Sequence, residues 1–245
     1  MKCVILAAGY ATRLYPLTEN YPKPLLKVGD KSILDWLIDD LAAASLIDEY
    51  VVISNHKYYQ AFEKWRETKT EKIKILDDGT ETNEKRLGAV QDLLFARQTA
   101  DLDDDLLIAA GDNLLDFSLL GFLNYYKKKQ KSCLMRYYEA DGDKLKKCGV
   151  IEVGADDRVL SMEEKPEKPK SHWCCPPFYL YRREDMACLE RALEEGCGAD
   201  APGSFAAWLC RNSEVYAMQM PGKRFDIGNL VSYENVKKEY RGILC

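Results

Sequence analysis

The sequence predicts an α/β fold with a mostly parallel central sheet. Short apolar runs with β propensity alternate along the chain with segments of helical periodicity, and helical segments separate the first four of these runs. This alternation is typical of βαβ units, in which consecutive strands run parallel. The 245 residues are enough for one large α/β domain or two small ones, with a sizeable core in either case.

The elements can be placed in order along the chain. The expected strands are Lys2–Leu6, Tyr50–Ser54, Lys72–Leu76, Leu106–Ala109, Cys133–Tyr137, Val150–Val153 and Phe178–Tyr181. The expected helices are Ser32–Ala44, Tyr58–Glu67, Arg86–Thr99, Leu119–Lys129, Glu184–Glu195 and Ser204–Arg211. Parallel sheets bind ligands at the carboxyl ends of their strands. The small, polar or acidic loops after the first four strands, at residues 8–13, 55–57, 77–79 and 111–113, should therefore gather at one edge and carry the chemistry.

Composition excludes several classes of protein. Apolar residues make up 47% and charged residues 31%, and the net charge is −5, so no basic footprint for nucleic acid is present. No apolar run approaches the roughly 20 residues of a membrane span, and the apolar N-terminus is interpreted as a buried first strand. The nine cysteines are scattered, which favours reduced thiols in a cytoplasmic protein.

The most informative segment is LAAGYATRLYPLTENYPKPLLKVG at residues 6–29. A Walker phosphate loop needs a lysine directly after its second glycine, and Gly9 is followed instead by Tyr10-Ala11-Thr12-Arg13. A dinucleotide fingerprint needs Gly-x-Gly-x-x-Gly, and Ala11 and Leu14 stand at the second and third glycine positions. The glycine spacing therefore excludes a dinucleotide-dependent oxidoreductase.

What remains is a tight turn of small residues followed by two cations. Backbone N–H groups of such a turn can approach a phosphate, and the Arg13 guanidinium can donate two parallel, charge-assisted hydrogen bonds to its oxygens. Lys23 is held between Pro22 and Pro24, which limit its backbone freedom. Two cations on one loop suit a polyphosphate. On these residues alone, a packing turn with two surface charges is an equal alternative.

This segment resembles the signature of the sugar-nucleotide pyrophosphorylases, nucleotidyltransferases that act on sugar 1-phosphates, such as those of the glucose-1-phosphate thymidylyltransferase type. The matching residues are Gly9, Thr12, Arg13, Leu14, Pro16, Thr18, Pro22 and Lys23. Ala11 replaces the second glycine of the family pattern. Alanine is small enough to allow close approach of a nucleotide if the backbone there does not need a positive φ.

Further stretches extend the resemblance to about residue 229. AAGDN at 109–113 resembles the loop with a metal-binding aspartate, here Asp112, and FDIGN at 225–229 resembles the segment with the second, here Asp226. GVIEV at 149–153 and MEEKPEKPKS at 162–171 resemble the sugar-phosphate segment. Arg86-Leu87-Gly88-Ala89 resembles a turn on the nucleotide side.

The resemblance implies a three-layer Rossmann-like nucleotidyltransferase fold, with residues 1–245 as a single catalytic domain and no appended β-helix or regulatory domain. The implied enzyme uses Mg²⁺ to couple a nucleoside triphosphate with a sugar 1-phosphate, giving a nucleotide sugar and pyrophosphate. The implied residues are catalytic Arg13, Lys23 and Lys165; nucleotide-binding Ala8, Gly9, Ala11, Thr12, Arg13, Gly88 and Asp112; sugar-phosphate-binding Gly149, Glu164, Lys165 and Tyr179; and metal-binding Asp112 and Asp226.

Several points stay open. Pro176-Pro177 stands where many relatives have a Thr-Gly-like pair, and residues 198–209 replace a segment that contacts sugar, so the acceptor is not determined. The alternatives are a cytidylyltransferase acting on a phosphorylated alcohol such as phosphocholine, and a catalytically silent regulatory subunit. His56 follows a strand and is a weaker candidate for substrate contact, whereas His172 is expected to be structural. The nucleobase and a homo-oligomeric state also stay open.

Overall fold

The computed structural model describes residues 1–243, which divide into two compact units. The first unit comprises Met1–Leu87, Ala110–Gly121 and the segment that begins at Pro221. The second comprises Gly88–Ala109 and Phe122–Met220. The prediction of a single domain stays a prediction.

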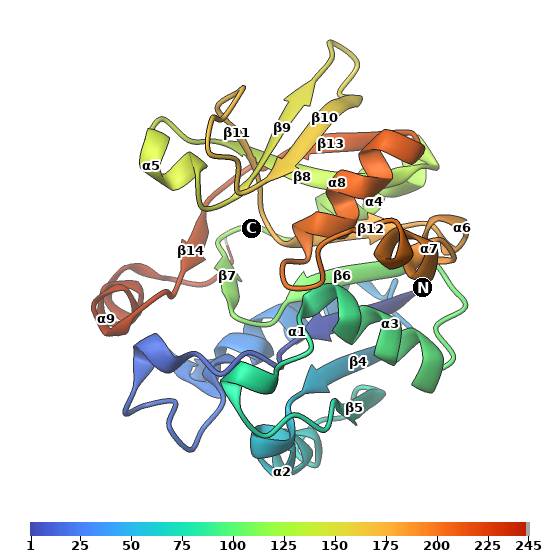
Figure 1. The fold of residues 1–245 in the computed structure, drawn as a ribbon. Coiled ribbons are helices and arrows are strands. Elements are labelled where there is room, and N and C mark those ends of the chain that lie inside the picture. Colours follow the sequence, from blue (N-terminus) through green and yellow to red (C-terminus); the bar gives the residue numbers. More distant parts are fainter. Residues whose placement is uncertain (244–245) are drawn as a thin grey trace. The chain divides into compact units, whose positions relative to one another are not determined.

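The first unit is built on three parallel strands. β1 (Lys2–Leu6) pairs with β4 (Glu49–Ser54), and β4 pairs with β5 (Ile73–Asp77). Helix α2 (His56–Arg66) follows β4 and packs against β5 (Figure 1). The other elements of this unit are β2 (Lys27–Val28), β3 (Lys31–Ser32), α1 (Ile33–Ala44), β7 (Asn113–Leu115), β14 (Arg224–Asp226) and α9 (Leu230–Glu239).

Local sequence explains where two helices of this unit begin. Ser32 caps α1 in a capping box with Asp35, because each side chain accepts a hydrogen bond from the other residue's backbone N–H. Asn55 caps α2 by accepting a hydrogen bond from Tyr58 N. Its amide also donates to the carbonyl of Ala8 at 2.9 Å. One capping residue thus joins the loop after β4 to the loop after β1.

The second unit carries a sheet that is mainly antiparallel. Its strand order is β10 (Val159–Glu164), β9 (Gly149–Val153), β11 (Trp173–Cys175), β8 (Ser132–Tyr138), β12 (Phe178–Tyr181), β6 (Leu106–Ala110), and β13 (Val215–Gln219) pairs with β8. Only the β13–β8 pair among these is parallel. The helices are α3 (Ala89–Thr99), α4 (Leu120–Lys129), α5 (Gly142–Leu145), α6 (Arg183–Met186), α7 (Leu189–Glu194) and α8 (Gly203–Asn212).

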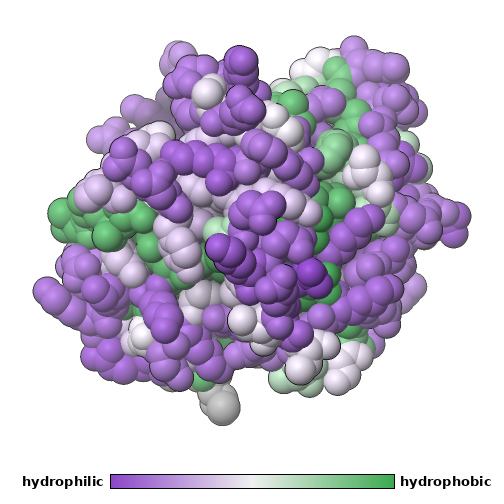
Figure 2. All heavy atoms as spheres, turned by 90° about the horizontal axis from the view of Figure 1, so that it is seen from below, coloured by the Kyte–Doolittle hydropathy of each residue, from purple (hydrophilic) through white to green (hydrophobic). Residues whose placement is uncertain are grey.

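The predicted α/β class is confirmed, and every predicted strand and helix is present. β1 and β12 match their predicted bounds, whereas the predicted helix at 184–195 is divided into α6 and α7. Most strands that were not predicted are short or carry charged residues, as in the VLSMEE of β10, whereas β13 (VYAMQ) is uncharged and five residues long and was also missed. The surface face in Figure 2 is mainly hydrophilic, in keeping with the composition. No helix of residues 1–243 combines the length and apolar character that crossing a membrane requires.

The prediction that all cysteines are reduced is wrong for one pair. Cys148 and Cys174 form a disulfide in the second unit, with their Cα atoms 6.1 Å apart. The spacing of cysteines along the chain carries no signal for this pair, because the partners meet only when β11 pairs with β9 and β8. The other cysteines of residues 1–243 are free thiols: Cys3, Cys133, Cys175, Cys188, Cys197 and Cys210.

Candidate active site

The loop after β1 has its carbonyl oxygens occupied by donors within the first unit. Ala8 O accepts from the Asn55 amide, and Ala11 O accepts from the Thr18 hydroxyl at 2.8 Å. Tyr58, buried in α2, donates its hydroxyl to Thr18 O at 2.5 Å, and Tyr10 O lies 3.3 Å from the same hydroxyl. The Tyr10 hydroxyl in turn donates to Thr80 O at 2.9 Å. These bonds hold the loop against α2 and the segment after β5.

The N–H groups of the same loop are left available. From Gly9 to Arg13, none of the backbone N–H groups has an acceptor within residues 1–243. Ala11 adopts a left-handed conformation, with φ 47° and ψ 41°, and the 3₁₀ turn Thr12–Leu14 follows it. Successive N–H groups around a left-handed residue form a concave anion-binding arrangement. This arrangement of N–H groups can therefore accept an anion such as a phosphate.

Gly9 supports this interpretation. A Cβ atom built on Gly9 would meet no atom of the protein within 4 Å, and its φ lies outside the left-handed region. Neither packing nor backbone conformation therefore requires glycine at this exposed position. A close approach by a ligand would require it. At Ala11, in contrast, φ is positive. Alanine is strained in this conformation, and glycine would not be.

Lys23 is buried and paired with Asp112. Only 7% of Lys23 is exposed, and its Nζ lies 2.8 Å from Asp112 Oδ2. Asp112 Oδ1 accepts a hydrogen bond from the Asn113 side chain at 2.7 Å. Burial alone would raise the pKa of Asp112, but the Lys23 ammonium and the more distant Arg224 outweigh it and hold that pKa below its ordinary value. Asp112 is therefore ionised at neutral pH.

Asp226 lies on the strand beside Asp112. β14 pairs with β7 in a register that sets Asp226 opposite Asn113, the residue that follows Asp112. Arg224 donates to Asn113 Oδ1 at 2.6 Å and lies 3.6 Å from Asp226 Oδ1. Asp226 thus lies at the end of a ladder that begins one residue after Asp112. Within residues 1–243, no group of three or more His, Cys, Asp or Glu side chains is placed to hold a metal ion, at this ladder or elsewhere.

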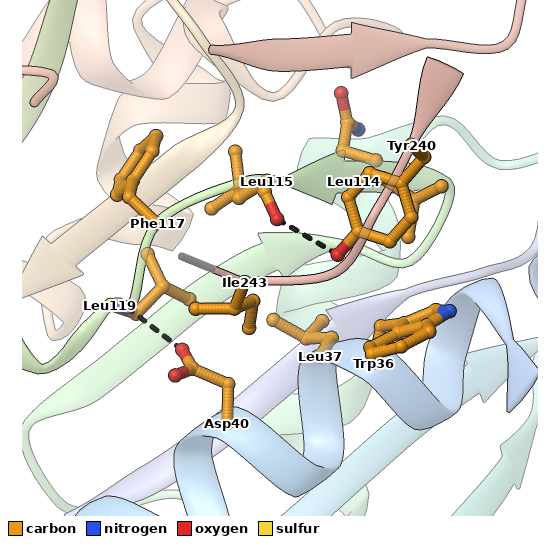
Figure 3. Close-up of a pocket in the computed structure, with 10 residues that line it drawn as sticks. Trp36, Leu37, Asp40, Leu114, Leu115, Phe117, Leu119, Tyr240 and Ile243 are labelled. Carbon is orange, nitrogen blue, oxygen red and sulfur yellow. Dashed lines mark hydrogen bonds between the residues drawn. The ribbon is translucent and has the colours of Figure 1, made fainter. Parts of the chain in front are cut away.

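One apolar cluster joins the segments that carry these groups. Leu14 follows Arg13, Leu26 belongs to the turn of Lys23, Leu114 follows Asn113, and Ile227 follows Asp226; all are buried in the same cluster. Figure 3 shows the apolar pocket at β7, where the Tyr240 hydroxyl donates to Leu115 O and the Asp40 carboxylate accepts from Leu119 N. This pocket has no cationic side chain in its lining, so it anchors β7 rather than binding phosphate.

The predicted sugar-phosphate residues belong to the second unit. Glu164 ends β10 and is the register partner of Gly149 in β9. Lys165 follows with φ 49°, and its backbone N–H donates to Cys148 O at 3.0 Å. A positive φ is uncommon for a lysine and is often found at functional positions. The Lys165 side chain is exposed and has no ion-pair partner in the described chain.

Two predicted residues of the second unit also have structural explanations. Gly88 caps α3 with φ 94°, and a Cβ there would lie 2.7 Å from Ala199 O. The next N–H groups, of Ala89 and Val90, donate to Asp200 O and Ala199 O. Tyr179 is 2% exposed and stacks on Tyr181 with ring centroids 5.5 Å apart. The geometry thus gives Gly88 and Tyr179 packing roles, and their ligand contacts stay predictions.

His56 lies at the start of α2 and has a carboxylate partner. Its Nδ1 is 2.6 Å from Asp77 Oδ2 at the end of β5. The hydrogen bond to Asp77, with the attraction between the two charges, raises the pKa of His56 above its ordinary value. The loops after β4 and β5 therefore meet here, as the predicted parallel arrangement requires.

Similarity to known proteins identifies the family. The model of the family described as nucleotidyl transferase matches residues 2–242. The chain belongs to the nucleotidyl transferase family. The chain is 30% identical over 240 residues to the bifunctional protein GlmU of Methanococcus vannielii, covering 93% of this chain and 52% of that protein.

Two further similarities support the membership of this family. The chain is 31% identical over 189 residues to the glucose-1-phosphate thymidylyltransferase of Mycolicibacterium smegmatis, covering 74% of this chain and 61% of the relative. The crystal structure of a UDP-glucose pyrophosphorylase complexed with UDP-glucose superimposes with a TM-score of 0.82 at 19% identity, covering 97% of each chain. That likeness confirms the Rossmann-like nucleotidyltransferase fold. The chain spans about half the length of the GlmU proteins it matches.

Proposed function

We propose that this chain transfers a nucleotidyl group from a nucleoside triphosphate to a sugar 1-phosphate. An oxygen of the sugar phosphate attacks the α-phosphorus, the bond from that phosphorus to the bridging oxygen breaks, and pyrophosphate leaves. The observation that carries the proposal is the loop from Gly9 to Arg13, whose N–H groups have no acceptor in residues 1–243, in a nucleotidyl transferase. Positioning and electrostatics do most of the work in such transfers.

The cations of the first unit act on the triphosphate. The exposed Arg13 side chain has no ion-pair partner in the described part of the chain, so its guanidinium is available to the departing pyrophosphate. Lys23 is buried and held by Asp112, so its charge has a defined position near phosphate oxygens. Removal of a cation that stabilises the transition state typically costs on the order of 10²–10³ in rate.

Asp112 and Asp226 suit a magnesium ion. Both offer carboxylate oxygens, and the β14–β7 register sets Asp226 opposite the neighbour of Asp112. Mg²⁺ is usually held by one or two carboxylates together with phosphate oxygens and water. The lowered pKa keeps Asp112 ionised, as a ligand to a hard cation must be. When bound, Mg²⁺ would neutralise phosphate charge and orient the triphosphate.

The second unit would hold the acceptor. We assign the phosphate of the sugar to Lys165 and a hydroxyl of the sugar to Glu164. No general base is needed, because a phosphate monoester is already ionised at neutral pH.

The free thiols of the described chain also favour a cytoplasmic protein, although Cys148 and Cys174 are paired.

A substrate matrix tests the function. The purified protein is incubated with Mg²⁺, each of ATP, CTP, GTP, UTP and dTTP, and a panel of sugar 1-phosphates plus phosphocholine, and pyrophosphate release is followed. Release that requires one sugar 1-phosphate is expected, with loss of the signal in EDTA. Release only with CTP and phosphocholine would move the acceptor to a phosphorylated alcohol. Bound nucleotide without release across the panel would contradict a transferase and favour a regulatory subunit.

A further inference from the structure

The carboxylate of Glu164 occupies space that two glycines leave free in the second unit. Glu164 is opposite Gly149 in the β10–β9 ladder, and Gly203 is the first residue of α8, which packs on β10. A Cβ built on Gly203 would clash with Glu164 Oε2 and lie 2.9 Å from its Cδ. A Cβ on Gly149 would lie 3.0 Å from the same Oε2. The carboxylate therefore lies in space that a side chain at Gly203 or at Gly149 would fill.

Local backbone conformation does not explain Gly203. Its φ is outside the left-handed region, so any L-residue could adopt this conformation. Glycine is also a poor helix former, and Gly203 begins a helix whose other residues are mostly good formers or core residues. The nearest obstacle to a side chain at Gly203 is the end of a flexible side chain, not the backbone. A larger residue could thus be accommodated, but only if the Glu164 carboxylate moved.

The carboxylate has no hydrogen-bond donor of its own. Across residues 1–243, no side chain or backbone group donates to it. Burial raises the pKa of Glu164, and the charge of Lys165 only partly opposes this. A half-buried carboxylate without a donor is costly unless a ligand supplies the donor. A sugar hydroxyl is a donor of the appropriate kind.

We propose that Gly203 is a positioning residue for the acceptor: its missing side chain keeps the Glu164 carboxylate where it accepts a hydrogen bond from an acceptor hydroxyl. The proposal rests on the proposed function, in which Glu164 binds the sugar. It also gives a role to the segment 198–209, which departs from the pattern of related enzymes. The specificity of this chain would then depend on the start of α8 rather than on a sugar-contacting side chain from it.

The test compares Gly203→Ala with Gly142→Ala. Both glycines are the first residue of a helix in the second unit, and a Cβ on Gly142 would meet nothing within 4 Å. In Gly203→Ala, the KM for the sugar 1-phosphate should rise about tenfold or more, because a hydrogen bond to a charged group is lost. The KM for the nucleoside triphosphate and the thermal midpoint should stay close to those of Gly142→Ala.

A double-mutant cycle with Glu164→Asp separates a positioning effect on Glu164 from a general disturbance of the second unit by the added methyl group. Aspartate is one methylene shorter, so in this background Gly203→Ala should change the acceptor KM less than threefold, which would show coupling of the two sites. An equal effect of Gly203→Ala in both backgrounds, or an unchanged acceptor KM, would overturn the proposal.

A measurement without substrate tests the placement of the Glu164 carboxylate independently of the proposed function. The Glu164 carboxyl is titrated by ¹³C NMR in the wild type and in both alanine variants. Its titration should shift in Gly203→Ala and stay unchanged in Gly142→Ala, and an unchanged titration in both would overturn the proposed placement. A wild type that transfers to no sugar 1-phosphate would contradict the proposed function alone, and the titration would still decide whether Gly203 positions Glu164.

Discussion

The ammonium of Lys23 lies 2.8 Å from the carboxylate of Asp112, although the two residues are 89 positions apart in the sequence. Lys23 comes from a proline-flanked turn, and Asp112 comes from the loop after β6. A buried lysine is stable only when its charge is compensated. Each member of this pair therefore fixes the other, and both belong to the candidate site.

Asp112→Asn should lower turnover by about 10²–10³-fold, because it removes a proposed ligand of Mg²⁺ and frees the Lys23 charge to move. The variant should still fold, but with a loss of about 3 kcal/mol in the free energy of unfolding, because the ammonium of the buried Lys23 loses its compensating charge. Initial rates and urea unfolding measure the two effects. Asp30→Asn, at an exposed turn, is the control for loss of a surface charge. A rate within threefold of wild type would remove Asp112 from the site.

Ala11→Gly should increase stability by up to about 1 kcal/mol. The left-handed conformation costs an L-residue roughly 1–2 kcal/mol, and the greater chain entropy of glycine offsets part of that gain. Ala8→Gly is the matched control in the same loop, because Ala8 is buried and has no positive φ. That control should lose stability. Urea unfolding of the two variants gives the comparison, and destabilisation by Ala11→Gly would contradict the assigned strain.

Gly9→Ala should raise the KM for the nucleoside triphosphate about tenfold and leave the thermal midpoint unchanged. The added Cβ meets nothing in the protein, so an effect on binding would come from the ligand. Gly142→Ala again serves as the control that adds a methyl group to open space. If Gly9→Ala bound the nucleotide as tightly as the wild type in calorimetry, the loop would not approach it closely.

His56 should titrate above its ordinary pKa of about 6.5, because Asp77 stabilises its protonated form. The contribution of the His56–Asp77 ion pair to the free energy of unfolding is then fully present below about pH 6.5. It is lost as the pH rises through the raised pKa of His56. NMR titration of the imidazole protons measures this directly. Asp77→Asn should return His56 toward its ordinary value. The same pKa in both proteins would exclude the ion pair in solution.

The Cys148–Cys174 disulfide predicts a thiol count. The chain has nine cysteines and one pair is oxidised, so the unfolded, unreduced protein should show 9 − 2 = 7 reactive thiols. Reduction before unfolding should restore nine. Ellman's reagent in denaturant measures both states. Nine thiols without reductant would show that the pair is reduced in the purified protein.

Local patterns made much of the fold predictable. Apolar runs bounded by turn residues placed β1 and β12 at their observed bounds, because burial and strand propensity act over a few residues. The pattern was weaker where strands are short or charged, and β10 and β14 were missed for that reason. Tertiary pairing stabilises such strands in spite of their composition.

For the site, the sequence by itself determined which residues are candidates: Gly9 and Arg13 after a strand, Lys23 between prolines, and the aspartates at 112 and 226. Only the tertiary structure decided the pairing of Lys23 with Asp112, the register of β14 on β7, the left-handed backbone at Ala11 and the contact of Gly203 with Glu164. The physical reason is range. Residue type and spacing act locally, whereas ion pairs, registers and steric contacts between distant segments exist only after the chain has packed.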